Sequence, residues 1–201
     1  EKHSSANSRL IPSLNFYRGV CLSRLNRYSE AREEIVNAMK AGFGPLSPRE
    51  SLLICKTMLL VGLYDLAIPI LETLTLKGIQ ATPEVWSMLG RAQSHCGELK
   101  RAISAYNESL RMESQQPEVL ALRAGCFRQI GDLNGAIKDY TQALKLAPKN
   151  QALYYPLALS HMQQGNLLDA RKRMELASKH EPQRSDLSLW LAMLHYMLND
   201  I

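Results

Sequence analysis

Several features that define common protein classes are scarce in this sequence. It has four cysteines in 201 residues and no C-x-x-C motif. Each cysteine lies in an apolar, helix-like pattern, where a reduced packing residue is the usual outcome. Reduced cysteines favour an intracellular, cytoplasmic protein over a secreted one. The four residues are Cys21, Cys55, Cys96 and Cys126.

Long apolar runs are also missing. No stretch approaches the roughly 18 apolar residues that a membrane span needs, and the first residues do not resemble a signal peptide. Membrane insertion is therefore not expected. The chain begins with Glu1 instead of methionine, so we expect a fragment or a processed product of a longer protein.

Groups that carry catalysis or hold cofactors are sparse as well. The sequence has five histidines and no glycine-rich phosphate loop. His161 and His195 occupy equivalent places in successive repeats, but no thiol or carboxylate is fixed beside them, so a zinc site is not expected. Adjacent carboxylates such as Glu33 and Glu34 fit a solvated helix surface. We therefore predict no catalytic residue, no metal ion, no cofactor and no enzymatic activity.

Charge of one sign does not dominate the chain either. The formal net charge is +5. A basic excess of this size is compatible with an acidic peptide, with RNA, or with no charged partner at all. Charge alone therefore does not select a partner.

What the sequence does contain is an internal repeat. When the segment 117–150 is aligned with 151–184, the equivalent glycines, alanines and prolines recur at a constant offset of 34. The same places recur upstream after steps of 34, 35 and 36 positions. The aligned pairs are Gly131 and Gly165, Ala136 and Ala170, Ala143 and Ala177, and Pro148 and Pro182; the upstream places are Gly97, Gly62 and Asn26, with Ala102, Ala67 and Ala31.

The recurring glycines are expected to end one helix and precede the next. A left-handed backbone is needed just after a helix, and glycine, followed by asparagine, adopts it at the lowest cost. Pro148 and Pro182 are expected to stop the second helix of their pairs. This prediction places left-handed residues at Asn26, Gly62, Gly97, Gly131, Gly165 and Asn199.

A second series of small residues recurs in the leading helix of each pair. We expect it to face the alanine series of the trailing helix, because small residues on both sides let two helices approach closely, where a bulky one would overpack. Such pairs cannot bury both faces alone, so neighbouring pairs are expected to stack into a right-handed superhelix. The leading series is Gly19, Cys55, Gly90, Ala124, Ala158 and Ala192.

With these places in register, the chain resembles the tetratricopeptide repeat family. The segments PEVWSMLGRAQSHCGELKRAISAYNESL and QALYYPLALSHMQQGNLLDARKRMELASKHEP carry its aromatic, small, glycine and alanine places at the family spacing. The resemblance implies an all-α, right-handed α-solenoid of helical hairpins. The boundaries expected are a polar segment 1–11, repeats 12–47, 48–82, 83–116, 117–150 and 151–184, and a segment 185–201 that is the leading helix of a sixth repeat or a capping helix.

The resemblance also implies that ligands lie on the concave face formed by the leading helices. In the middle repeats we expect Lys56, Arg91 and Arg128 to point inward, which would suit an acidic extended peptide. The alternative is that these basic side chains are simply solvated. Expected flanking residues are Arg24, His95 and Gln129.

Towards the C-terminus the inward-facing set becomes apolar and rich in methionine. Such a surface suits an amphipathic helix or another hydrophobic segment of a partner. The alternative is packing against a further repeat, since the segment 185–201 is apolar over most of its surface. The residues of this set are Tyr155, Leu159, Met162, Leu189, Met193 and Met197. The possible partner or next-repeat surface of the segment 185–201 consists of Leu189, Trp190, Met193 and Met197.

Two more specific functions of repeat proteins can be compared with the sequence. Some members of the family clamp the acidic tails of heat-shock chaperones with lysine, arginine and asparagine, but the matching places here are Phe16, Val20, Leu53, Met88 and Leu122, so we reject that function. The second is single-stranded RNA binding of the pentatricopeptide type, suggested by first and second repeats that are 36 and 35 long. The later spacing of 34 and the small basic excess argue against it.

The sequence therefore predicts a non-catalytic scaffold or adaptor. It would hold a peptide or a helix of a partner protein in its concave groove, within a larger complex. Pentatricopeptide-like RNA binding is the alternative.

Overall fold

The computed structural model describes residues 2–44, 47–76 and 81–198, and it describes the side chains from residue 11 onward. Within these ranges all regular structure is helical. The chain divides into two compact units, 1–98 and 99–201, and each is described by itself below.

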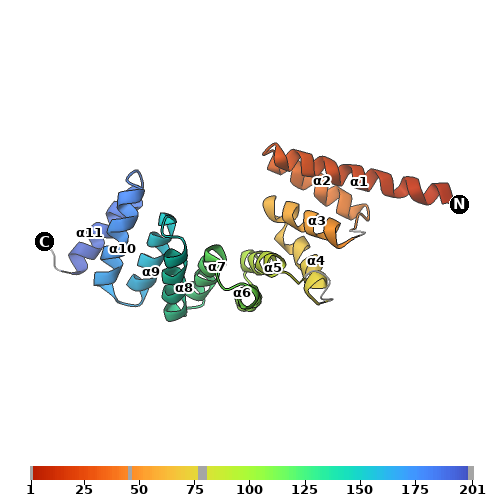
Figure 1. Ribbon diagram of the computed structural model, residues 1–201. Coiled ribbons are helices and arrows are strands. Elements are labelled where there is room, and N and C mark those ends of the chain that lie inside the picture. The colour runs from red at the N-terminus through yellow and green to blue at the C-terminus, as the bar shows by residue number, and fades with distance from the viewer. Residues whose placement is uncertain (1, 45–46, 77–80, 199–201) are drawn as a thin grey trace. The chain divides into compact units, whose positions relative to one another are not determined.

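The first unit contains two helical hairpins followed by one more helix (Figure 1). Helix α1 packs against α2, α3 packs against α4, and α4 packs against α5. The bounds are α1 Lys2–Arg24, α2 Tyr28–Lys40, α3 Pro48–Leu60, α4 Tyr64–Leu76 and α5 Pro83–His95.

The second unit continues the same pattern. Each helix from α6 to α11 packs against the next one in the chain (Figure 1). The bounds are α6 Leu99–Met112, α7 Pro117–Gln129, α8 Leu133–Leu146, a 3₁₀ turn η1 Gln151–Leu153, α9 Tyr154–Gln163, α10 Leu167–His180 and α11 Ser185–Met197.

The N-terminal helix is longer than the sequence predicts. We expected a polar segment 1–11 followed by a repeat from residue 12, but α1 runs without interruption from Lys2 to Arg24 and includes Pro12. In Figure 1 its N-terminal half extends past α2. A helix of 23 residues needs no apolar periodicity along its whole length, because its C-terminal half already packs against α2.

The turns between the paired helices lie where the sequence places them. Asn26 has φ +60°, and Gly62, Gly97, Gly131 and Gly165 have φ between +77° and +85°. The prediction of left-handed residues is therefore confirmed at these five places, whereas Asn199 lies outside the described residues. Pro148 and Pro182 each lie just beyond the end of a trailing helix, since α8 ends at Leu146 and α10 at His180.

We predict that Gly131→Ala destabilises the second unit by about 1 kcal/mol, because an L side chain is strained at a left-handed φ. A Cβ at this residue would contact nothing within 4 Å, so the cost is one of backbone conformation alone. Chemical denaturation of Gly131→Asn should show a smaller loss, because asparagine tolerates this conformation better than alanine. Equal stability of the alanine variant and the wild type would contradict the prediction.

Two leading helices of the first unit, α3 and α5, begin at side-chain caps. The Ser47 hydroxyl accepts a hydrogen bond from the Glu50 amide at 3.3 Å, and the Glu50 carboxylate accepts one from the Ser47 amide at 3.0 Å. The Thr82 hydroxyl accepts from the Val85 amide at 3.3 Å. A proline follows each cap, where its missing N–H costs nothing. These caps fix where α3 and α5 begin.

The seam between paired helices is made of small residues, as predicted. Ala31, Ala67, Ala136 and Ala170 are fully buried on the trailing helices. A Cβ on Gly19 would lie 2.8 Å from Ile35 Cγ1 and 3.1 Å from the Ala31 carbonyl oxygen, which shows how closely α1 and α2 approach. Large side chains such as Leu71, Tyr140 and Met174 fill the rest of the core.

A buried ion pair ties three helices of the second unit together. The Arg123 guanidinium on α7 donates two hydrogen bonds, at 2.6 and 2.8 Å, to the carboxylate of Asp139 on α8. It donates a third, at 2.7 Å, to the side-chain oxygen of Asn107 on α6. The Asp139 side chain is only 5% exposed. The sequence did not indicate this network.

Candidate interaction surface

Six of the predicted residues lie at the places of a repeating grid on the three leading helices of the second unit: Arg128, Tyr155, Leu159, Met162, Leu189 and Met193. Ala124 on α7, Ala158 on α9 and Ala192 on α11 occupy equivalent places in successive repeats. The residues three before, one after and four after each alanine share one face of their helix. They are Ala121, Gly125 and Arg128 on α7; Tyr155, Leu159 and Met162 on α9; and Leu189, Met193 and Tyr196 on α11.

On α9 and α11 this face is apolar and partly open to solvent. Leu189 is 72% exposed, Tyr196 76%, Met197 50% and Met193 37%. The side chains from α9 are half-buried and pack against the core that α9, α10 and α11 share, as does Trp190. We call Tyr155, Leu159, Met162, Leu189, Met193, Tyr196 and Met197 the C-terminal apolar face. Exposed apolar side chains gathered in this way mark an interaction site more often than scattered ones do.

A trailing helix after α11 would not cover this face. In the preceding hairpin, Ala158 is the residue that is buried in one core with Ala170 of the trailing helix α10. Its equivalent on α11 is Ala192, which is exposed. Tyr155, Leu159 and Met162 keep part of their surface exposed although α10 and α11 both lie in place. Their equivalents on α11 would therefore stay accessible beside an added trailing helix.

One edge of the face carries a net negative charge. At the start of α11, the Arg184 guanidinium lies 4.4 Å from the centre of the Tyr155 ring. It donates hydrogen bonds to Asp186 at 2.8 Å and to Glu181 at 2.9 Å. These hydrogen bonds, first the one to Asp186, raise the pKa of Arg184, and the same guanidinium lowers the pKa of Asp186. Two carboxylates thus surround one guanidinium.

The other edge of the face carries a positive charge. Arg128, near the C-terminal end of α7, is half-buried, and its Nε is buried without a hydrogen-bond partner. Burial raises the pKa of the Tyr140 hydroxyl, and the charge of Arg128 partly offsets this effect. No carboxylate in the described part of the unit forms an ion pair with Arg128. Gln129, the flanking residue predicted beside it, is exposed.

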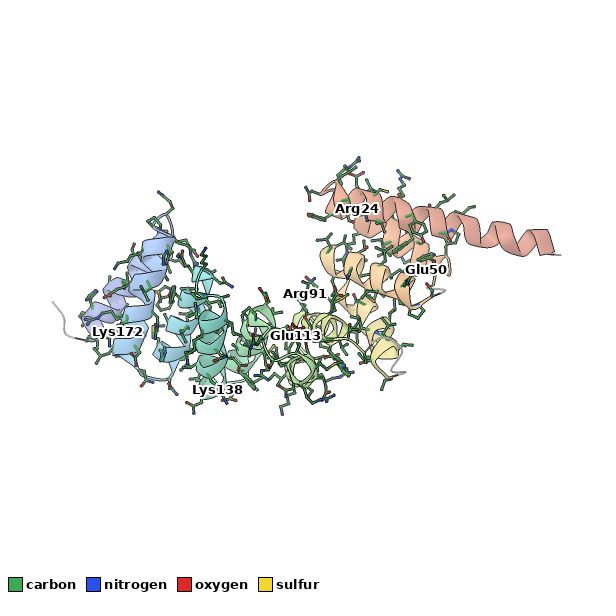
Figure 2. All side chains as sticks on the ribbon, in the orientation of Figure 1. Arg24, Glu50, Arg91, Glu113, Lys138 and Lys172 are labelled. Atoms are coloured by element: carbon green, nitrogen blue, oxygen red, sulfur yellow. The ribbon has the colours of Figure 1, made fainter. Side chains whose placement is uncertain are left out.

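The remaining predicted groove residues belong to the first unit. Lys56 on α3 is exposed, but its ammonium forms a 2.8 Å ion pair with Glu84 on α5, which partly neutralises the charge expected to meet a ligand. His95 stacks on the ring of Tyr64 at 4.1 Å. Arg91 projects from α5 into solvent (Figure 2). Since Lys56 and Arg91 lie in one unit and Arg128 in the other, their joint action on one ligand stays a prediction.

The residues at the places where other family members clamp the acidic tails of chaperones are mostly part of the core here. Phe16 is 1% exposed and stacks on Phe43, Val20 is 7% exposed, and Met88 is 9% exposed. Leu122 is exposed but apolar. None of these side chains can donate a hydrogen bond to a carboxylate.

The described residues contain no group of three or more histidine, cysteine, aspartate or glutamate side chains arranged to hold a metal ion. Burial lowers the pKa of His161, and the nearby Asp169 opposes this effect. In the part of the chain that the structure describes, none of the helices has both the length and the apolar character needed to cross a membrane.

Sequence reasoning missed one prominent residue of the C-terminal apolar face. Tyr196 was not among the predicted site residues, although it is the most exposed side chain of the face. It occupies the place on α11 that Met162, which was predicted, occupies on α9. Extending the repeat spacing into the last helix would have found it.

Comparison with known proteins identifies the repeat. Models described as tetratricopeptide repeat match residues 83–116 and 155–201, and one described as TPR repeat matches 126–165. Together these matches span more than half of the chain. Among curated proteins, no sequence match was found.

Solved structures of tetratricopeptide proteins resemble this fold. MamA from Desulfovibrio magneticus RS-1, from residue 41 onward, superposes with a TM-score of 0.70 and 18% identity over 76% of this chain and 85% of that one. TTC0263 of Thermus thermophilus gives 0.61 and 22% over 91% and 98%. YrrB, described as a TPR protein with an unusual peptide-binding site, gives 0.64 and 14% over 93% and 91%. The chain belongs to the tetratricopeptide repeat family and has an all-α fold of the solenoid type.

Proposed function

We propose that this chain is a non-catalytic scaffold or adaptor whose C-terminal apolar face holds an apolar segment of a partner protein. The observation that carries the proposal is the exposure of Leu189, Met193, Tyr196 and Met197 on one side of α11. Unbranched methionine side chains adapt to different apolar ligands, and tyrosine adds a rigid surface with a polar tip. The description of YrrB as peptide-binding is consistent with such a role in a related fold.

The partner segment would be either amphipathic or extended, with apolar side chains directed at α9 and α11. RNA binding is less well supported, because this face offers one unpaired cation instead of a row of them among the described residues. None of the four cysteines, all of them among the described residues, forms a disulfide, which suits a protein that acts inside the cell.

A random peptide library displayed against the intact chain tests this proposal. We expect selection of peptides with large apolar residues, and we expect Leu189→Ser with Met193→Ser to weaken a selected peptide at least tenfold. Loss of two buried apolar contacts easily exceeds the ~1.4 kcal/mol that a tenfold change requires. Fluorescence anisotropy with the labelled peptide measures the change.

The matched control for this experiment is Leu168→Ser. Leu168 is 57% exposed on α10 and lies outside the C-terminal apolar face. Its substitution should change the affinity less than twofold, and circular dichroism should show the same helical content for all variants. If the Leu168 variant and the double variant lose affinity equally, or neither does, the peptide does not bind this face.

A further inference from the structure

At the edge of the C-terminal apolar face, the grid residues on α7 are smaller than their equivalents on α9. Here the grid holds Ala121 and Gly125 where α9 holds Tyr155 and Leu159. A Cβ at residue 125 would meet only one atom within 4 Å, the hydroxyl oxygen of Tyr140 at 3.6 Å. The hydroxyl end of Tyr140 therefore comes close to α7 at Gly125, while the rest of the Tyr140 side chain is buried in the core.

Arg128 follows Gly125 by one helical turn on the same face of α7, so it lies on the part of the helix that the Tyr140 hydroxyl approaches. Its Nε is buried without a partner, and no carboxylate among the described residues pairs with it. Unlike Arg184 at the opposite edge, this guanidinium therefore has its charge available for a ligand.

We propose that Arg128 and Tyr140 form a subsite for one carboxylate of the bound segment, next to the C-terminal apolar face. This inference rests on the proposed function and adds that the bound segment carries an acidic residue. A carboxylate matches the planar fork of an arginine and accepts a hydrogen bond from a tyrosine hydroxyl. Glu181 and Asp186 at the start of α11 repel an acidic group, so the acidic residue of the ligand lies at the α7 edge.

The geometry also sets the order of residues within the ligand. Arg128 lies on α7, whereas the exposed apolar side chains lie on α9 and α11, the leading helices that follow. The segment therefore carries its acidic residue to one side of its apolar residues, and not between them.

The test uses the same random peptide library on the intact wild-type chain and on Arg128→Gln. On the wild type we expect enrichment of an aspartate or glutamate to one side of the enriched apolar residues. On Arg128→Gln the acidic preference should disappear while the apolar preference remains. A selected peptide should lose roughly tenfold in affinity for Arg128→Gln, and its aspartate-to-asparagine version should bind both proteins equally.

Two controls separate the subsite from general electrostatics. Arg91→Gln removes an exposed guanidinium from α5 in the other unit and should leave the acidic preference unchanged. Arg128→Lys keeps the charge but loses the planar fork, and should retain only part of the affinity. Apolar enrichment without any acidic preference, or an acidic preference that survives in Arg128→Gln, overturns the subsite but leaves the proposed function standing. Absence of apolar enrichment overturns both.

Discussion

Replacement of Asp139 by alanine should destabilise the second unit by about 3 kcal/mol. The substitution leaves the Arg123 guanidinium with a single remaining hydrogen bond, to Asn107. The Arg123 side chain is only 20% exposed, so water cannot fully replace the lost carboxylate. Breaking one partner of a buried ion pair typically costs about 3–5 kcal/mol, and the partial exposure of Arg123 puts this case at the lower end. Urea denaturation, followed by circular dichroism, measures the loss.

An exposed ion pair of the same unit provides the control. Arg111 and Glu108 form a 3.0 Å pair within α6, and their side chains are 71% and 40% exposed. Removing such a pair changes stability by about 0.5 kcal/mol at most. Equal effects of Glu108→Ala and Asp139→Ala would mean that the Arg123 network contributes no more than a surface pair. Replacing Arg123 and Asp139 together by methionine and leucine should recover much of the lost stability, because no unpaired charge then remains.

Gly19→Ala should destabilise the first unit by about 1–2 kcal/mol. The added Cβ would lie 2.8 Å from Ile35 Cγ1 and 3.1 Å from a backbone oxygen of α2, so the two helices must move apart. Overpacking of this kind costs about 1–3 kcal/mol, from which the better helix propensity of alanine removes roughly 0.5–1 kcal/mol. Thermal and chemical denaturation both report the net loss.

The glycine-to-alanine substitution at Gly125 should change stability in the opposite direction. Gly125 lies inside α7, and a Cβ there would meet only the Tyr140 hydroxyl oxygen, at an ordinary 3.6 Å. Gly125→Ala should therefore stabilise the protein by about 0.5–1 kcal/mol. If both variants shift stability in the same direction, the close approach of α1 and α2 is not what keeps glycine at residue 19.

Much of the fold could be predicted because the repeat depends on local chemistry. A left-handed turn restricts the choice of residue at Gly62 or Gly131 whatever surrounds it, and a tight seam does the same for Ala136. Both signals recur at a fixed spacing, so the pattern in one hairpin supports the prediction of the next hairpin. The N-terminal helix carries no such signal before residue 12, and its start at Lys2 was therefore missed.

The candidate site was predicted less completely. The repeat spacing placed Leu159, Met162, Leu189 and Met193 at equivalent places, but Tyr196 was left out although it aligns with Met162 at the same spacing. The pairing of Lys56 with Glu84 could not be read from the sequence, because the two residues lie far apart in the chain, on separate helices.

The sequence by itself determined the helical hairpins, their turns and the alanine seam, since each depends on the size or backbone freedom of a single residue type. Only the tertiary structure decided which charges are neutralised by residues far away in the chain: Lys56 by Glu84 and Arg123 by Asp139, with Arg128 left without a carboxylate partner among the described residues. Long charged side chains reach neighbours on other helices, and that reach depends on how the helices pack instead of on the local sequence.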